Sequence, residues 1–146
     1  MTTILVIEDD AAFRRMVVRV LAGAGHEVSE ASDGREGLAL FRAHHPALVI
    51  TDILMPEREG IETIRQLRRE AESVAIIAIS GGGAPPYLRY LDFASKLGAD
   101  ATLAKPFYPA ELIETVNRVV PPFGSGRAGR EAPSGDPQTA RKPPST

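Results

Sequence analysis

The sequence predicts an α/β fold, a doubly wound parallel sheet of five strands with helices on both faces. Short apolar runs rich in β-branched residues alternate with segments whose apolar residues follow helical spacing. The third and fourth runs are almost continuously apolar, as strands buried on both faces require. For five such strands the common order is 2-1-3-4-5. The expected strands span residues 4–7, 28–31, 47–51, 74–79 and 101–104.

The first two helices have recognisable start and stop signals. Asp10 can cap the first turn of the first helix, and Gly23 and Gly25 can end it. The second helix is expected over residues 35–44, where Pro46 stops it. The apolar stripe of the first helix consists of Phe13, Met16, Val17, Val20 and Leu21.

The remaining three helices follow the same pattern. A stripe from Ile61 to Leu67 marks the third, and the fourth is expected over residues 86–97, with Gly98 at its end. Pro109 suits the first turn of the fifth. The apolar residues of the fifth helix are Leu112, Ile113, Val116, Val119 and Val120.

Composition excludes several classes of protein. The 146 residues include 17 basic and 19 acidic side chains, a net charge of -2, so nothing draws the chain as a whole to nucleic acid or to an anionic membrane. Cysteine is absent, which rules out disulfides, thiolate metal sites and thiol nucleophiles. No apolar run approaches the roughly 18 residues of a membrane span. We therefore expect a cytoplasmic protein.

The chain divides into two parts. Residues 1–120 carry the alternating pattern and form one domain. Residues 121–146 contain six prolines, four glycines and a single large apolar residue, Phe123. Such a segment buries too little apolar surface to offset its ordering entropy, so we expect a disordered tail.

Polar residues follow four of the predicted strands. Glu8 and Asp9 come after the first, Asp52 after the third, Ser80 after the fourth and Lys105 after the fifth. In the order 2-1-3-4-5 these four strands are neighbours, and ligands bind beyond the carboxyl ends of such strands. Since Asp10 also follows the first strand, we expect three or four carboxylates, a hydroxyl and an ammonium in one cleft. Each residue alone would equally suit a helix cap, a turn or a solvated surface.

The charges of this cluster point to a cation and a phosphoryl group. Two unit charges ~4 Å apart repel by about 4 kcal/mol at an effective dielectric constant of 20. Carboxylates so placed either raise their pKa values or bind a cation. An all-oxygen set favours Mg²⁺ or Mn²⁺. The carboxylate of Asp52 can then attack phosphorus, while Lys105 and the Ser80 hydroxyl bind the phosphoryl oxygens.

Four stretches of sequence carry a resemblance to a known family. They are residues 4–10 (ILVIEDD), 52–56 (DILMP) with Gly60, 79–81 (ISG) and 98–107, which begin GAD and end KPF. In this order and spacing, over residues 1–120, the chain resembles the receiver domain of two-component response regulators. The resemblance implies a flavodoxin-like fold.

The resemblance also implies a role for each matching residue. Asp52 corresponds to the phosphoacceptor, Lys105 to the lysine that pairs with the phosphoryl group, and Ser80 to the hydroxyl that follows that group on activation. Asp10 falls outside the acidic pair and stays a helix cap. The implied ligands of Mg²⁺ are Asp9, its partner Glu8, Asp52 and the backbone carbonyl of Leu54.

Two departures from the family pattern concern the conformational switch. Thr102 stands where the family usually has an aromatic ring that turns inward. Residues 80–86 form a longer, more glycine-rich loop than is usual. We hypothesise that this loop, with Tyr87 and Tyr90, carries the switch in place of the ring.

The expected function is that of a stand-alone receiver. By resemblance, its phosphoryl donor is a histidine kinase or a histidine phosphotransfer protein, and its target is a downstream protein. Contact with nucleic acid or membrane is not expected, and the chain is expected to be a monomer or a weak homodimer. It is a phosphoacceptor signalling domain and not an enzyme.

Three alternatives remain open. The chain could be the receiver fragment of a regulator whose DNA-binding or other output domain lies outside it. An aspartate-nucleophile phosphatase of similar topology needs a second Asp two residues after the nucleophile, where this chain has Leu54. A flavodoxin-like nucleotide binder needs a phosphate loop or a ring-stacking site, and the sequence has neither.

Overall fold

A computed structural model describes residues 2–53, 59–80, 96 and 98–120 of the chain. The tail 121–146 and, Lys96 excepted, the helix expected over 86–97 lie outside the described residues. The elements, in chain order, are β1 (Thr3–Ile7), α1 (Ala11–Gly23), β2 (Glu27–Ala31), α2 (Gly34–His44), β3 (Leu48–Asp52), α3 (Glu59–Glu70), β4 (Ala75–Ser80), β5 (Ala101–Ala104) and α5 (Pro109–Val119).

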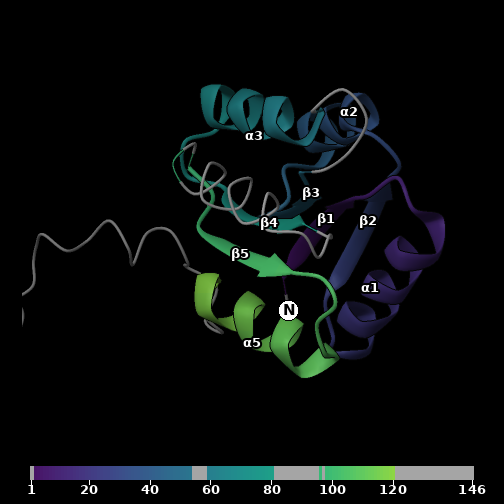
Figure 1. The fold of residues 1–146 in the computed structure, drawn as a ribbon. Helices are drawn as coiled ribbons and strands as arrows, with labels where there is room; N and C mark the ends of the chain where they lie inside the picture. Colours follow the sequence, from purple (N-terminus) through teal and green to yellow (C-terminus); the bar gives the residue numbers. More distant parts are fainter. Residues whose placement is uncertain (1, 54–58, 81–95, 97, 121–146) are drawn as a thin grey trace, which may run out of the picture.

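The five strands form one parallel sheet in the order β2-β1-β3-β4-β5, which confirms the predicted fold class and strand order. Helices α2 and α3 cover one face of this sheet, and α1 and α5 cover the other (Figure 1). Within the described residues, no helix combines the length and the apolar character that a bilayer span requires.

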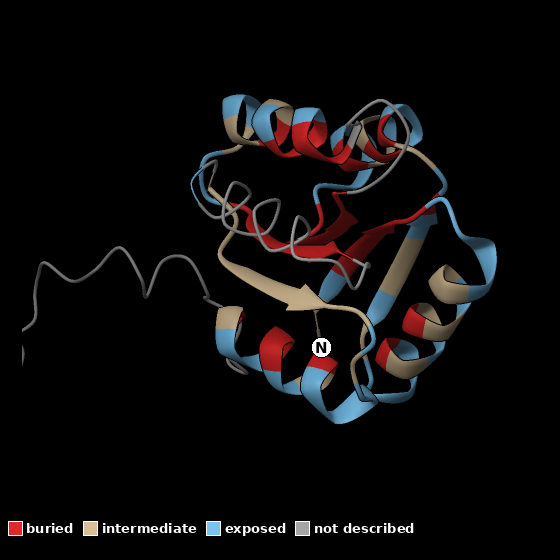
Figure 2. Ribbon diagram, viewed as in Figure 1, coloured by how far each residue is buried: buried red, intermediate tan, exposed pale blue. Residues whose placement is uncertain are grey.

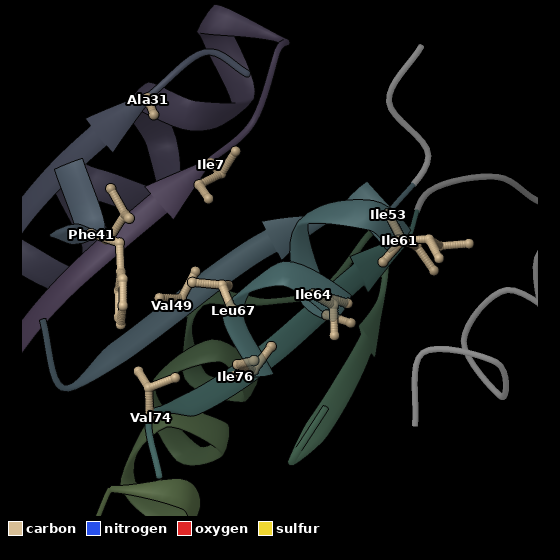
Figure 3. Packing of buried hydrophobic residues seen from close by; sticks show 12 residues of the cluster. Ile7, Ala31, Phe41, Val49, Ile53, Ile61, Ile64, Leu67, Val74 and Ile76 are labelled. Atoms are coloured by element: carbon tan, nitrogen blue, oxygen red, sulfur yellow. The ribbon is translucent and has the colours of Figure 1, made fainter. Parts of the chain in front are cut away.

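Each face of the sheet has its own hydrophobic core. Side chains alternate along a strand, so Leu5 and Ile7 of β1 pack with α2 and α3, whereas Ile4 and Val6 pack with α1 and α5. All residues of β3 and β4 are buried, and these strands lie at the centre of the molecule (Figure 2). Figure 3 shows the first core, where Phe41 and Leu67 meet the sheet.

The predicted helix signals act as expected in α1 and α2. The Asp10 carboxylate accepts a hydrogen bond from the Phe13 N–H at 3.1 Å, which confirms the cap. Gly25, just past the end of α1, has a φ of 96°, a conformation that glycine adopts without a steric penalty. Helix α2 ends at His44, before Pro46, and His45 takes the left-handed conformation there with a φ of 49°.

The strand ends differ slightly from the prediction. Asp52 and Ser80 were expected just after their strands, but they are the last residues of β3 and β4. Asp52 still pairs with Ile79, and Ser80 with Ala104, so the ladder continues one residue further than the apolar run.

The entry into β5 is fixed by Arg68 near the end of α3. Its guanidinium donates to the Gly98 carbonyl at 2.7 Å and to the Asp100 carboxylate at 2.9 Å. The same Asp100 oxygen accepts from the Ile76 N–H of β4 at 2.9 Å. These contacts join α3, β4 and the segment before β5, and so place β5 with its following Lys105 at the sheet edge.

Candidate functional site

The strand register brings the predicted site residues to one edge of the sheet. Ile7 of β1 pairs with Thr51 of β3, so Glu8 and Asp52 follow side by side. On the other side of β3, Asp52 pairs with Ile79, and Ser80 comes one residue later. Lys105 follows Ala104, the partner of Ser80. The convergence that the sequence predicted is therefore present in the fold.

Lys105 joins the two buried acids. Its Nζ lies 2.8 Å from Asp52 Oδ2 and 3.2 Å from Glu8 Oε1. Both acids are almost inaccessible, with Glu8 3% and Asp52 4% exposed. Buried charges persist only when they are paired and hydrogen-bonded, and Lys105 supplies that pairing.

The burial of Glu8 changes its acidity. Loss of water around the carboxyl, together with the neighbouring Asp52 carboxylate, raises the pKa of Glu8 to about 7, against the opposing effects of the Asp10 N–H and Lys105. Burial would lower the pKa of Lys105, but its hydrogen bonds and attraction to Asp52 and Glu8 outweigh this and raise that pKa. The lysine therefore stays cationic at neutral pH.

Three carboxylates form a group that suits a divalent cation. Oxygen atoms of Glu8, Asp9 and Asp52 all lie within 4.8 Å of one another. Asp9 is exposed, whereas the other two are buried, so the group faces solvent on one side. Beside one lysine, the three carboxylates would carry two excess negative charges once all three are ionised, and a hard dication with oxygen ligands would balance these charges. Of the predicted ligands, Leu54 lies outside the described residues.

The predicted switch residues are partly described. Ser80 is completely buried at the end of β4, and its carbonyl accepts from the Lys105 N–H at 2.8 Å. Thr102 is half-buried in β5, paired with Ala78. The loop of residues 81–86, with Tyr87 and Tyr90, lies outside the described residues.

Two residues of α1, whose role here was not predicted from the sequence, contact the site. Arg14 donates to the Glu8 carbonyl at 2.7 Å and to the Glu30 carboxylate of β2 at 2.9 Å. The Phe13 ring lies under the Lys105 ammonium, 4.1 Å from Nζ to the ring centroid. Their position in the first turn of α1, next to the acidic pair, is the signal that could have found them.

Gly60 lets α3 approach the backbone at the end of β3. A Cβ at this position would lie 2.1 Å from the Asp52 carbonyl oxygen and 2.4 Å from Ile53 Cα. Only a residue without a side chain fits there without movement of the backbone. The glycine thus fixes how closely the first turn of α3 supports Asp52.

Comparison with known proteins adds sequence relatives. Residues 4–117 match the response regulator receiver domain. Chemotaxis protein CheY of Thermotoga maritima is 36% identical over 117 residues, which cover 79% of this chain and 95% of that protein. The probable transcriptional regulator ycf27 of Porphyridium aerugineum is 35% identical over 117 residues, 80% of this chain and 47% of that protein. The chain thus spans about half the length of such ycf27 relatives.

Solved structures share the fold. Chemotaxis protein CheY4 of Vibrio cholerae superposes with a TM-score of 0.74 at 31% identity, over 82% of this chain and 98% of that one. A response regulator receiver domain protein of Clostridium thermocellum gives 0.75 at 31% identity, over 81% and 93%. Since the domain match runs through nearly all of the sheet and its helices, this chain belongs to the family of response regulator receiver domains.

Proposed function

We propose that this chain is a stand-alone receiver that accepts a phosphoryl group on Asp52, in an Mg²⁺-dependent reaction, from a histidine kinase or a histidine phosphotransfer protein. This proposal is supported above all by the surroundings of Asp52, whose carboxylate contacts the Lys105 ammonium and lies within 4.8 Å of carboxylate oxygens of Glu8 and Asp9. Receiver domains are phosphoacceptor signalling domains, so the chain takes part in its own labelling without being classed as an enzyme.

The chemistry needs one bond made and one broken. An oxygen of the Asp52 carboxylate attacks phosphorus and forms a mixed anhydride, while the P–N bond of the donor phosphohistidine breaks. The departing imidazole keeps the electron pair and takes a proton from solvent. Lys105, already 2.8 Å from Asp52, neutralises charge on the transferred group, and Ser80 offers a hydroxyl to its oxygens.

The carboxylates of Glu8, Asp9 and Asp52 provide oxygen ligands for a divalent cation. When bound at Glu8, Asp9, Asp52 and the Leu54 carbonyl, Mg²⁺ (or Mn²⁺) supplies positive charge against the phosphoryl oxygens. Glu8 and Asp9 hold their places because the β1 ladder and the Asp10 cap fix the backbone on either side. Ser80, whose hydroxyl follows the phosphoryl group, then starts the conformational change that a protein target reads, with no direct contact with nucleic acid or membrane.

The test is labelling by acetyl phosphate with Mg²⁺, followed by intact mass. We expect one added phosphoryl group on the wild type, no label on Asp52→Asn, and strongly reduced labelling with a chelator. Asp10→Asn is the matched control, because it removes a neighbouring carboxylate but keeps a good helix cap, and it should still label. A label that survives Asp52→Asn would move the chemistry to another residue.

The relatives differ in whether the receiver stands alone or is joined to a further domain. The match to Thermotoga maritima CheY, which covers 95% of that protein, favours a stand-alone receiver. The ycf27 relatives, of which the chain spans 47%, favour instead a receiver attached to an output domain. An antibody against residues 1–120 would decide: a cellular protein of the mass of 146 residues supports the first, and one about twice as large supports the second.

A further inference from the structure

Besides its two carboxylate partners, the Lys105 ammonium has a third neighbour, an aromatic ring. Asp52 and Glu8 accept from Nζ at 2.8 and 3.2 Å, and the ring of Phe13 lies 4.1 Å from the same atom. The side chain of Lys105 is only 21% exposed. The ammonium is therefore enclosed by two carboxyl groups and the negative face of an aromatic ring.

The Phe13 ring is itself held in place. Phe107, two residues after Lys105, meets it with ring centroids 5.7 Å apart and an interplanar angle of 79°. Both rings border the hydrophobic core between the sheet and helices α1 and α5. The ring of Phe13 is thus fixed by α1 on one side and by the segment after β5 on the other.

A fixed ring matters because lysine is flexible. Its ammonium ends a four-carbon stem, and without restraint it samples many positions at a cost in side-chain entropy. A ring that covers one side of the ammonium attracts the cation and keeps water from it. Phosphoryl transfer depends on the positions of the charged groups around phosphorus, so such a restraint acts on the reaction rate.

We propose that Phe13 is a positioning residue for phosphoryl transfer to Asp52, because its ring face holds the Lys105 ammonium at the edge of the sheet. This inference rests on the proposed function. Phe13 touches neither the donor nor the acceptor oxygen, and it makes and breaks no bond. The effect of Phe13 on the rate of phosphoryl transfer depends entirely on Lys105. It should therefore vanish when Lys105 is replaced, whereas an effect of Phe13 on packing should remain.

The test is a double-mutant cycle read by the rate of labelling with acetyl phosphate at saturating Mg²⁺. Phe13→Leu removes the ring but keeps apolar volume, and Phe13→Tyr keeps the ring. Both are measured with Lys105 present and in a Lys105→Met background, which has no ammonium to position. Thermal unfolding of each variant shows that it is folded at the assay temperature.

We expect Phe13→Leu to label about three- to tenfold more slowly than the wild type, and Phe13→Tyr to label at about the wild-type rate. In the Lys105→Met background, Phe13→Leu should cause no further loss. Equal slowing in both backgrounds would assign Phe13 to packing alone and overturn the inference. An unchanged rate with Lys105 present, or a Phe13→Tyr variant as slow as Phe13→Leu, would overturn it as well.

A second readout is independent of labelling. The ε-methylene protons of a lysine above a ring resonate upfield, so those of Lys105 should be shifted in the wild type and in Phe13→Tyr and should return to ordinary values in Phe13→Leu. If the wild type takes no label at all, the proposed function fails, and this shift alone decides whether Phe13 holds the ammonium. If the wild type labels but the shift is absent, only the inference about Phe13 fails.

Discussion

Among single residues, Arg14 shows how a side chain outside the acidic group supports it. Its guanidinium donates to the backbone carbonyl of Glu8 and to the carboxylate of Glu30, so it joins α1, the end of β1 and β2. The Glu8 N–H in turn donates to the Ala31 carbonyl at 3.0 Å. The backbone at Glu8, next to Asp9, is therefore restrained by hydrogen bonds from α1 and to β2.

Arg14→Gln should weaken Mg²⁺ binding by about tenfold, because residues that orient metal ligands typically contribute about this much. The measurement is a Mg²⁺ titration followed by amide resonances. Arg15→Gln is the matched control: Arg15 is exposed, and the loss of a nearby cation should leave Mg²⁺ affinity unchanged or slightly higher. Equal changes in the two variants would mean that charge, not the contact with Glu8, sets the affinity.

At this scale the residues of the charged cluster could be predicted from the sequence, but the α1 side chains that contact them could not. Glu8, Asp52 and Lys105 were predictable because each follows an apolar run, and parallel strands end at a common edge. Phe13 was predicted only as part of an apolar stripe, since its spacing fits a core residue equally well. Its contact with Lys105 depends on a side-chain direction that no spacing rule encodes.

Among the elements, the pairing of α3 with the end of β3 depends on Gly60. The helix passes so close to Asp52 and Ile53 that an added Cβ meets backbone atoms, which cannot rotate away as a side chain does. Alanine is otherwise the better helix former by about 1 kcal/mol. The steric and the intrinsic effects therefore have opposite signs at this position.

We expect Gly60→Ala to lower the free energy of unfolding by about 2 kcal/mol, since overpacking against a rigid neighbour outweighs helix propensity. Gly23→Ala is the matched control, because a Cβ at the end of α1 meets nothing within 4 Å. That variant should be neutral or slightly stabilising. Urea unfolding of both proteins measures the difference, and a Gly60→Ala protein as stable as Gly23→Ala would refute the close approach.

Helices α2 and α3 are joined on the surface by Arg42 and Glu70. Hydrogen bonds from Arg42 and Gln66 lower the pKa of Glu70 from 4.5 to about 2. A carboxyl whose pKa is lower in the folded state stabilises the fold above its unfolded pKa and loses that effect as the pH falls through its folded pKa. The contribution of this ion pair is therefore present at neutral pH and disappears between about pH 4.5 and 2.

Glu70→Gln should accordingly lower the unfolding temperature at pH 7, and the gap to the wild type should close as the pH falls from 4.5 towards 2. The effect should shrink in high salt, because the pair is at the surface. Glu72→Gln, an exposed change of the same charge close by, serves as the control. A gap that stays constant with pH would show that Glu70 acts through packing.

For the whole molecule, the strand order and both cores could be predicted from pattern alone. Continuous apolar runs identified β3 and β4 as central strands, and alternation with helices implied the parallel order. Contacts between distant segments could not be predicted in this way. Arg68 reaches Gly98 and Asp100, some 30 residues further along the chain, through geometry that exists only after α3 and β4 have packed.

The contact between Lys105 and Glu8 spans 97 positions of the chain. On the ribosome the acids are synthesised first, and the cation that balances them is made only after all five strands have been translated. A nascent chain from which Lys105 has not yet emerged lacks the cation that pairs with Glu8 and Asp52. The charged cluster therefore cannot be completed until translation of the sheet is complete.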